Sequence, residues 1–504
     1  MEALLMHRDD DVALAMQDLA ASRTIQVDGR SITLKQSVPS GHKVAVRSIA
    51  FGERVHKYGQ AIGRATADIA PGEHVHTHNL ESLRGRGDLA LSSQHTVGPI
   101  IAVHAPVAHS PVTCEGPSAK TFLGYRRKDG RAGVRNHVLV LATVGCANTV
   151  VDTIGQKLPE VVAVSHVYGC SQIGDDLTLT RRVLEEFAAH PNVGAVLLVG
   201  LGCETMPTAE MSDQLAARGA TVRRLVIQDE GGSRATAARG IAIARELMQE
   251  VSHAAREPVS LSELTVAVEC GGSDAWSGVT ANPAVGVASD LLVAAGGTVI
   301  LSEVTEFIGA EHLLAARAAD ESVARQIRKA TLGREREANR MGVDMRGAQP
   351  TPGNMAGGLT TIEEKSLGTI SKGGSTLVRE VLPYADPPTQ HGLVIMDTPG
   401  NDPESVTAMV AGGAQIVVFT TGRGSPTGCP IAPVIKVATN SAMYQRLKED
   451  MDVDAGTVIS AGESLASAGG RIWDEILATA NGQLTASEAW GHKEFAISSI
   501  GPRL

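Results

Sequence analysis

The chain has 504 residues and a formal net charge of −10, and 43% of its residues are hydrophobic while only 3% are aromatic. This length allows about three domains with full hydrophobic cores. The acidic balance, the lack of a Lys/Arg block and the scarcity of aromatic residues argue against nucleic acid or an anionic membrane as a partner. The N-terminus lacks a signal-peptide pattern and no segment resembles a transmembrane helix, so we expect a cytoplasmic protein whose six cysteines are thiols.

Residues 1–79 predict a small β-rich domain, because short β-like segments alternate there with turn residues. The segment closes with His74, His76 and His78, whose spacing of two points all three imidazoles to one face of a strand. Residues 80–120 are rich in Gly, Ser, Pro and Ala and are interpreted as a linker.

From residue 121 onward, predicted strands alternate with predicted helices, which is typical of parallel sheets with right-handed crossovers. We divide this part into a first α/β domain, 121–262, and a C-terminal α/β domain, 263–504. The Gly/Pro-rich segment 341–375 predicts a long loop, and long loops in compact domains are usually functional. The helices are expected at 177–190, 208–219, 232–251 and 310–330.

Four predicted strands each run into a cysteine, and a fifth ends in two glutamates. The cysteines are Cys146, Cys170, Cys203 and Cys270, and the glutamates are Glu303 and Glu306. Because neighbouring parallel strands open their carboxyl ends onto one crevice, we expect these groups to share one rim with His166. Each of the four cysteines has a glycine neighbour, which allows a close approach of backbone to a ligand. A single free cysteine often packs as a small hydrophobe, but this group indicates a site for a metal or for acid/base chemistry.

The type of metal centre stays open at this point. The sequence has no CxxC pair, so a structural zinc site or a ferredoxin-type cluster lacks its signature, although three dispersed cysteines could still hold a cluster. The histidines of 74–78 are candidate ligands, since imidazole is the commonest metal ligand, with a solvated strand face as the alternative.

Several cationic residues are candidates for binding a carboxylate. His42, Lys43 and Lys57 lie in the N-terminal domain, where they are either substrate-binding or ordinary surface residues. The Gly-rich stretch 420–436 could cradle an anion with backbone N–H groups, but it matches neither a Walker A motif nor a Rossmann fingerprint. Its end, Lys436, could transfer a proton if burial lowered its pKa, and the alternative is a turn with a surface lysine.

Long segments of the chain resemble the altronate/galactarate dehydratase family, and the N-terminal segment GHKVAVRSIAFGERVHKYGQAIG resembles its SAF-type β-clip domain. The resemblance implies an α/β fold with a small N-terminal β-clip (SAF-like) domain followed by two parallel-sheet α/β domains. The matching motifs are FLGYRRKDGRAGVRNHVLVLATVGCANTV (122–150), SHVYGCSQIGDD (165–176), GAVLLVGLGCE (194–204), ECGGSDAWSGVTANPAVG (269–286), SEVTEFIGAE (302–311), PTPGNMAGGLTTIEEKSLG (350–368), TPGND (398–402) and TTGRGSPTGCPIAPVIKVATN (420–440).

The resemblance further implies a metal-dependent dehydration of a sugar acid to a 2-keto-3-deoxy acid. The expected cofactor is a divalent metal, Fe2+ with Mn2+ as a possible substitute, and the expected partners are a small sugar acid and further copies of the chain. We assign catalytic roles to His166, Lys436 and Glu204. The substrate-binding candidates are His42, Lys43, Lys57, Arg423, Asn401 and Asp402, and the metal-binding candidates are His74, His76, Cys146, Cys170, Cys203 and Cys270.

Three other interpretations stay open. The chain could be a lyase of the same fold that removes another leaving group, as from sulfolactate. It could be a non-catalytic protein that binds a sugar acid, or an iron–sulfur hydro-lyase. Cys429 stands where altronate dehydratases often have a glycine, so the identity of the sugar acid also stays open.

Overall fold

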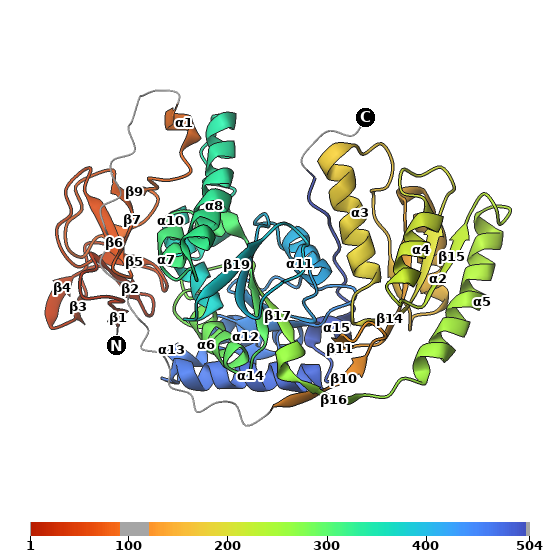
Figure 1. Ribbon diagram of the computed structural model, residues 1–504. Coiled ribbons are helices and arrows are strands. Elements are labelled where there is room, and N and C mark those ends of the chain that lie inside the picture. The colour runs from red at the N-terminus through yellow and green to blue at the C-terminus, as the bar shows by residue number, and fades with distance from the viewer. Residues whose placement is uncertain (1, 91–119, 500–504) are drawn as a thin grey trace.

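The computed structural model describes residues 2–90 and 120–499, which form three bodies arranged in a row (Figure 1). The β-rich N-terminal domain lies at one end, the C-terminal α/β domain in the centre and the first α/β domain at the other end. The predicted fold class is confirmed, since a small β domain precedes two domains built on parallel sheets. In these two ranges no helix is long and apolar enough to cross a membrane.

The N-terminal domain consists of short antiparallel strands. One sheet has the order β1-β2-β5-β8, a second has the order β6-β7-β9, and β3 and β4 form a hairpin. The hairpin turn is Asp28-Gly29, whose positive φ angles of 47° and 76° suit a two-residue turn. The strands are β1 (Ala3–Leu4), β2 (Val12–Ala15), β3 (Thr24–Val27), β4 (Arg30–Thr33), β5 (Lys43–Ala45), β6 (Arg54–Lys57), β7 (Gln60–Ala65), β8 (His74–Val75) and β9 (Leu80–Glu81).

The predicted linker begins inside ordered structure. Its first residues form β9, which pairs with β7, and the short helix α1 (Gly87–Ala90). Residues 91–119 of this segment lie outside the described residues.

The first α/β domain is a parallel four-stranded sheet with the order β13-β12-β14-β15 and helices on both faces (Figure 1). Helices α2 and α5 share one hydrophobic core with the sheet, while α3 and α4 share another that continues into the C-terminal domain. The elements are β12 (His137–Ala142), α2 (Asn148–Lys157), β13 (Val162–Val164), α3 (Gly174–Ala188), β14 (Val193–Gly200), α4 (Thr208–Ala217), β15 (Val222–Val226) and α5 (Ser233–Ser252). Three of the predicted helices are therefore confirmed to within three residues at each end.

A small antiparallel sheet closes this domain at its base and joins it to the next. It has the order β11-β10-β16 and consists of β10 (Thr121–Arg126), β11 (Ala132–Gly133) and β16 (Glu257–Ser260).

The C-terminal domain is a parallel seven-stranded sheet with the order β19-β20-β18-β17-β21-β22-β23. Helices α6 (Ala281–Ala294) and α14 (Leu465–Ala480) pack together on one face, and α11 (Asp402–Ala411) lies on the other against α3. The strands are β17 (Thr265–Cys270), β18 (Thr298–Leu301), β19 (Val378–Leu382), β20 (Gly392–Met396), β21 (Ile416–Thr421), β22 (Val434–Ala438) and β23 (Val453–Asp454).

Two predictions for this domain are wrong. The helix expected at 310–330 is two helices, α7 (Glu311–Ala316) and α8 (Glu321–Met341), because the Asp320 side chain caps a new helix by accepting from the Val323 N–H. The expected loop 341–375 contains α9 (Pro352–Ala356) and α10 (Ile362–Thr369). All eight residues of α10 are buried, so the helix lacks the amphipathic period that would predict it.

The expectation of a single rim is also wrong. The strands that end near Cys146, Cys170 and Cys203 belong to the four-stranded sheet, whereas those that end near Cys270 and Glu303 belong to the seven-stranded sheet. The sequence shows only that each segment is a parallel strand and not which sheet contains it.

Candidate active site

The carboxyl edge of the seven-stranded sheet lies against the N-terminal domain. The loop that follows β17 donates the Ala275 N–H to the Gly357 carbonyl at 2.9 Å, and Trp276 packs against Gly41 of the N-terminal domain. The loop that follows β21 joins the same surface, since the Gly422 N–H donates to the Gly272 carbonyl at 3.2 Å. Ligands of open parallel sheets bind at such an edge, so this covered edge is the candidate site.

A buried charge cluster fastens the two domains together. Glu364 of α10 accepts from Lys43 Nζ at 2.8 Å and from Lys57 Nζ at 2.9 Å, and none of the three side chains is more than 1% exposed. Burial alone would raise the pKa of Glu364, but the two lysine charges outweigh it and lower the pKa to about 2. Both lysines were predicted to bind substrate, and the structure places them instead on a carboxylate of the chain itself.

Three histidines of the N-terminal domain converge beside this cluster. His42, which directly precedes β5, and His74, on the neighbouring β8, approach to 2.9 Å between Nδ1 and Nε2. His76 stacks on His74 with 5.5 Å between ring centroids, and its Nδ1 lies 3.1 Å from Thr360 Oγ1 of the C-terminal domain. One nitrogen from each of His42, His74 and His76 lies within 4.8 Å of the others. His42, predicted as a substrate-binding residue, therefore joins the two predicted metal ligands.

The protonation state of these histidines suits metal binding. Burial, reinforced by the nearby charges of His42 and Lys43, lowers the pKa of His74 to about 4 and that of His76 to about 3. Imidazoles with such pKa values are neutral at pH 7, which is the form that binds a metal ion. Three neutral imidazoles form a donor set that fits a divalent transition metal.

A second cluster lies where β17 and β18 end. Cys270 Sγ is 3.5 Å from Glu306 Oε2, and the two glutamates that follow β18 are paired with buried lysines. Lys365 Nζ lies 2.7 Å from Glu306 and Lys372 Nζ lies 2.5 Å from Glu303. Burial raises the pKa of the Cys270 thiol well above its ordinary value and that of Glu303 to about 7.

The cluster continues through carboxylates toward Lys436. Oxygens of Glu269, Glu303 and Asp402 lie within 4.8 Å of one another. Burial raises the pKa of Asp402 to about 6, whereas burial lowers the pKa of Lys436 to about 7. Lys436 Nζ lies 3.6 Å from the centroid of the Phe419 ring and donates to the Thr427 carbonyl. Two neighbouring groups with pKa values near neutrality are suited to proton transfer.

Several members of this network were missed in the sequence. Lys365 and Lys372 lie in the segment that was taken for a loop, and Glu269 directly precedes Cys270 in a strand that is otherwise apolar. Glu269 Oε1 is buried without a hydrogen-bond partner in the described structure. The sequence offered two signals: a carboxylate inside an apolar strand, and charged residues within a Gly-rich segment. Each indicates a buried charge that needs a partner.

Two further predicted residues lie at the same edge. Asn401 caps α11 by accepting from the Glu404 N–H at 3.4 Å, and its side chain is exposed. Arg423 is exposed in the loop that follows β21, beside Gly272.

The remaining predicted residues lie in the first α/β domain. His166 uses both ring nitrogens on backbone groups, with Nε2 2.7 Å from the Ala142 carbonyl and Nδ1 3.1 Å from the Tyr168 N–H. The Glu204 carboxylate accepts from Thr208 Oγ1 at 2.6 Å and from the Gly202 N–H at 2.6 Å. These contacts favour structural roles for both residues.

The structure places Cys146, Cys170 and Cys203 in this domain, and Cys270 in the other.

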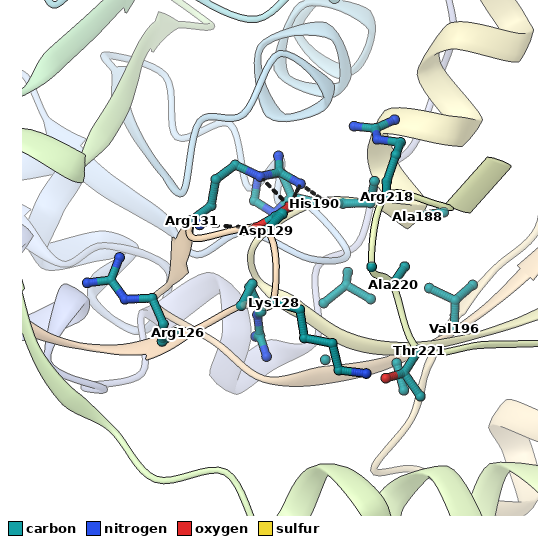
Figure 2. Close-up of a pocket in the computed structure, with 16 residues that line it drawn as sticks. Arg126, Lys128, Asp129, Arg131, Ala188, His190, Val196, Arg218, Ala220 and Thr221 are labelled. Carbon is teal, nitrogen blue, oxygen red and sulfur yellow. Dashed lines mark hydrogen bonds and ion pairs between the residues drawn. The ribbon is translucent and has the colours of Figure 1, made fainter. Parts of the chain in front are cut away.

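The structure contains a cavity in the first α/β domain and a smaller one beside the candidate site. One of about 150 Å3 lies between the β10–β11 turn and the first α/β domain, and Figure 2 shows Arg126, Lys128, Arg131 and Arg218 on its walls. None of the predicted site residues lines it. A cavity of about 10 Å3, which is room for about one water, lies between Tyr58 of the N-terminal domain and residues of α10.

The buried carboxylate–lysine network at the edge of a parallel sheet indicates an α/β enzyme. Comparison with known proteins gives the family. The family models match residues 1–83 (altronate/galactarate dehydratase SAF domain), 124–252 (D-galactarate dehydratase/altronate hydrolase, second domain) and 261–503 (D-galactarate/altronate dehydratase, C-terminal). The chain belongs to this family of hydro-lyases.

Similar curated proteins cover the chain from end to end. It is 38% identical to the altronate dehydratase of Escherichia coli (strain K12) over 100% of both chains, and 36% identical to that of Bacillus subtilis (strain 168) over 99% of both. It is also 39% identical to the (2R)-sulfolactate sulfo-lyase subunit beta of Chromohalobacter salexigens, over 76% of this chain and 98% of that subunit.

Proposed function

We propose that this protein removes water from a sugar acid of the altronate or galactarate type and releases a 2-keto-3-deoxy acid. One observation carries the proposal: helix α10 links a histidine set suited to a divalent metal with a buried acid–base network, since Glu364 pairs with Lys43, next to His42, and Lys365 pairs with Glu306. Membership of the dehydratase family supports the reaction class.

The chemistry needs a group that takes the weakly acidic C2 proton. We assign this role to Lys436, because burial lowers its pKa to about 7 and a neutral amine can accept a proton at that pH. Asp402, with a pKa raised to about 6, is its neighbour and is placed to return a proton to the C3 hydroxide as it leaves. The resulting enol becomes the keto acid by tautomerisation.

The histidines define the proposed cofactor site. His42, His74 and His76 would hold a divalent metal, which we propose to be Fe2+ with Mn2+ as a substitute. A bound ion would act as a Lewis acid toward the carboxylate and hydroxyl oxygens of a hydroxy acid. Arg423, exposed at the same edge, is proposed to bind a substrate carboxylate.

The test is an anaerobic assay of the purified chain with added Fe2+. Keto acid is measured from D-altronate, galactarate and other aldonates, with and without a chelator. We expect keto acid from one of these acids, loss of the activity with chelator and recovery when iron is returned. Sulfolactate is included because the chain is also similar to a sulfo-lyase subunit. Release of sulfite, with no keto acid from any sugar acid, would overturn the proposal.

A further inference from the structure

Three thiols of the first α/β domain are exposed and lie at one edge of its sheet. Cys146 follows β12, Cys170 follows β13 and Cys203 follows β14, and these are adjacent strands in the order β13-β12-β14. Free cysteines are among the most buried residue types, so three exposed thiols at neighbouring strand ends call for an explanation. The proposed dehydration makes no use of them.

Hydrogen bonds fasten the three thiol-bearing loops to one another. The Gly145 N–H, one residue before Cys146, donates to the Tyr168 carbonyl at 3.0 Å. The Gly169 carbonyl, one residue before Cys170, accepts from the N–H of Thr205 at 3.2 Å and from its hydroxyl at 3.0 Å. The loop of Cys170 therefore contacts the loops of both other cysteines.

The glycines before two of these cysteines hold the loops in a special conformation. Gly169 has a φ of 93°, and a Cβ atom there would lie 2.3 Å from the Thr143 carbonyl oxygen. Gly202 has a φ of 121°, and a Cβ atom there would lie 2.4 Å from Gln228 Oε1. Only glycine fits either position, so the loops are built to place Cys170 and Cys203 where they are.

Three helix N-termini at this edge favour a negatively charged centre, and the carboxylates of Asp175 and Asp176 in the first turn of α3 oppose them. Helices α2, α3 and α4 all begin within five residues after Cys146, Cys170 and Cys203, so three helix N-termini lie at this edge. Helix N-termini carry partial positive charge and free N–H groups. The one carboxylate in the Cys203 loop, Glu204, is held by its own loop and by Thr208.

We propose that Cys146, Cys170 and Cys203 bind an iron–sulfur cluster of the [4Fe–4S] type. Three thiolates sharing one tetrahedral metal ion would lie about 3.8 Å apart, given metal–sulfur bonds of about 2.3 Å. The three sulfurs are not among the groups whose ligand atoms lie within 4.8 Å of one another. A cluster binds each thiolate to a different iron, which accommodates the wider spacing.

The cluster would keep one iron free of protein thiolate. Among the described residues the other free cysteines, Cys270 and Cys429, are buried in the C-terminal domain. The fourth iron is therefore open to an oxygen ligand such as water, a hydroxyl or a carboxylate. This centre is separate from the histidine set, which lies in the N-terminal domain.

The test is anaerobic reconstitution of the full-length chain with Fe2+, sulfide and a thiol reductant, followed by desalting. We expect a broad visible absorbance that bleaches on reduction and about four sulfides per chain, with about four irons in the His74→Ala/His76→Ala variant, which lacks the proposed histidine site. The Cys146→Ser, Cys170→Ser and Cys203→Ser variants lose this absorbance. The matched control Cys429→Ser, and the His74→Ala/His76→Ala variant, keep it, so the result is independent of the dehydratase assay.

A second measurement protects the test against misfolded variants. Wild-type protein is treated with iodoacetamide before reconstitution, which modifies the exposed thiols of the folded chain, and it then fails to acquire the absorbance. No sulfide-dependent absorbance in the unmodified wild type would overturn the proposal. So would a cluster that survives replacement of all three cysteines.

Discussion

The carboxyl edges of the two parallel sheets differ in what surrounds their cysteines. In the four-stranded sheet Cys146, Cys170 and Cys203 are exposed in glycine-containing loops. In the seven-stranded sheet Cys270 is buried against Glu306, and a lysine pairs with each glutamate that follows β18. The same position on the same type of sheet thus carries two kinds of chemistry, because the groups at one edge are buried and the thiols at the other are exposed.

Burial explains the difference. Burial at the seven-stranded edge shifts the pKa values of Asp402, Glu303 and Lys436 toward neutrality. The thiols of the other edge remain in contact with solvent, where a soluble cofactor can reach them. Variants of the buried groups and of the exposed Arg423 test this contrast.

The largest effect is expected at the histidine set. The double variant His74→Ala/His76→Ala should lower turnover by about ten-thousandfold, because Lewis-acid stabilisation by a metal supplies several kcal/mol. Turnover is measured anaerobically with saturating Fe2+, and circular dichroism checks the fold. His253→Ala, an exposed histidine after α5, is the matched control. A double variant as active as the control would remove the histidines from the mechanism.

A somewhat smaller effect is expected at the proposed base. Lys436→Met should lower turnover by about a thousandfold, which is typical of a lost general base. Because the pKa of Lys436 is lowered to about 7, its neutral form increases above that pH. Wild-type turnover should therefore rise with pH through about 7, and the variant should lack this limb. A pH profile of the same shape in both proteins would exclude Lys436 as the base.

The buried charge cluster of Glu364, Lys43 and Lys57 should contribute to the free energy of unfolding. Glu364→Gln leaves Lys43 and Lys57 buried without their carboxylate, which should lower the free energy of unfolding by about 3–5 kcal/mol. Glu463→Gln, which removes the partner of the half-exposed Arg471, should cost about 1 kcal/mol or less. Denaturant titration measures the free energy of unfolding of both variants. Equal decreases in the two variants would contradict a stabilising role of the buried charge cluster.

The same charge cluster predicts that the stability of the protein depends on pH. The folded pKa of Glu364 is about 2, below its ordinary value of 4.5, so its contribution is complete above about pH 4.5 and is lost as the pH falls toward 2. Wild-type stability should fall more steeply than that of Glu364→Gln over this range. If the stability of both proteins fell in parallel with pH, the two lysines would not stabilise the ionised carboxylate of Glu364.

The smallest effect is expected at the exposed cation. Arg423→Ala should raise KM by about tenfold to a hundredfold and change kcat little, since a charged hydrogen bond to the substrate contributes about 1.5–3 kcal/mol. Arg423→Lys should recover part of the loss. Unchanged KM in the alanine variant would show that the carboxylate binds elsewhere.

The sequence predicted the fold better than the site. The parallel strands and the helices of the first α/β domain were clear because long apolar runs alternate with amphipathic segments. Helix α10 was missed because it is buried on all sides, and Glu364 and Lys365 were missed with it. His42 joins His74 only through the pairing of β5 with β8, and strand pairing between distant segments leaves no local pattern.

The central claim is that the metal of the proposed reaction binds to the three histidines. Crystals soaked anaerobically with Mn2+ test it directly through anomalous scattering. The account predicts a peak at bonding distance from nitrogens of His42, His74 and His76. A peak among Glu269, Glu303 and Asp402, whose oxygens also lie close together, with none at the histidines, would contradict it.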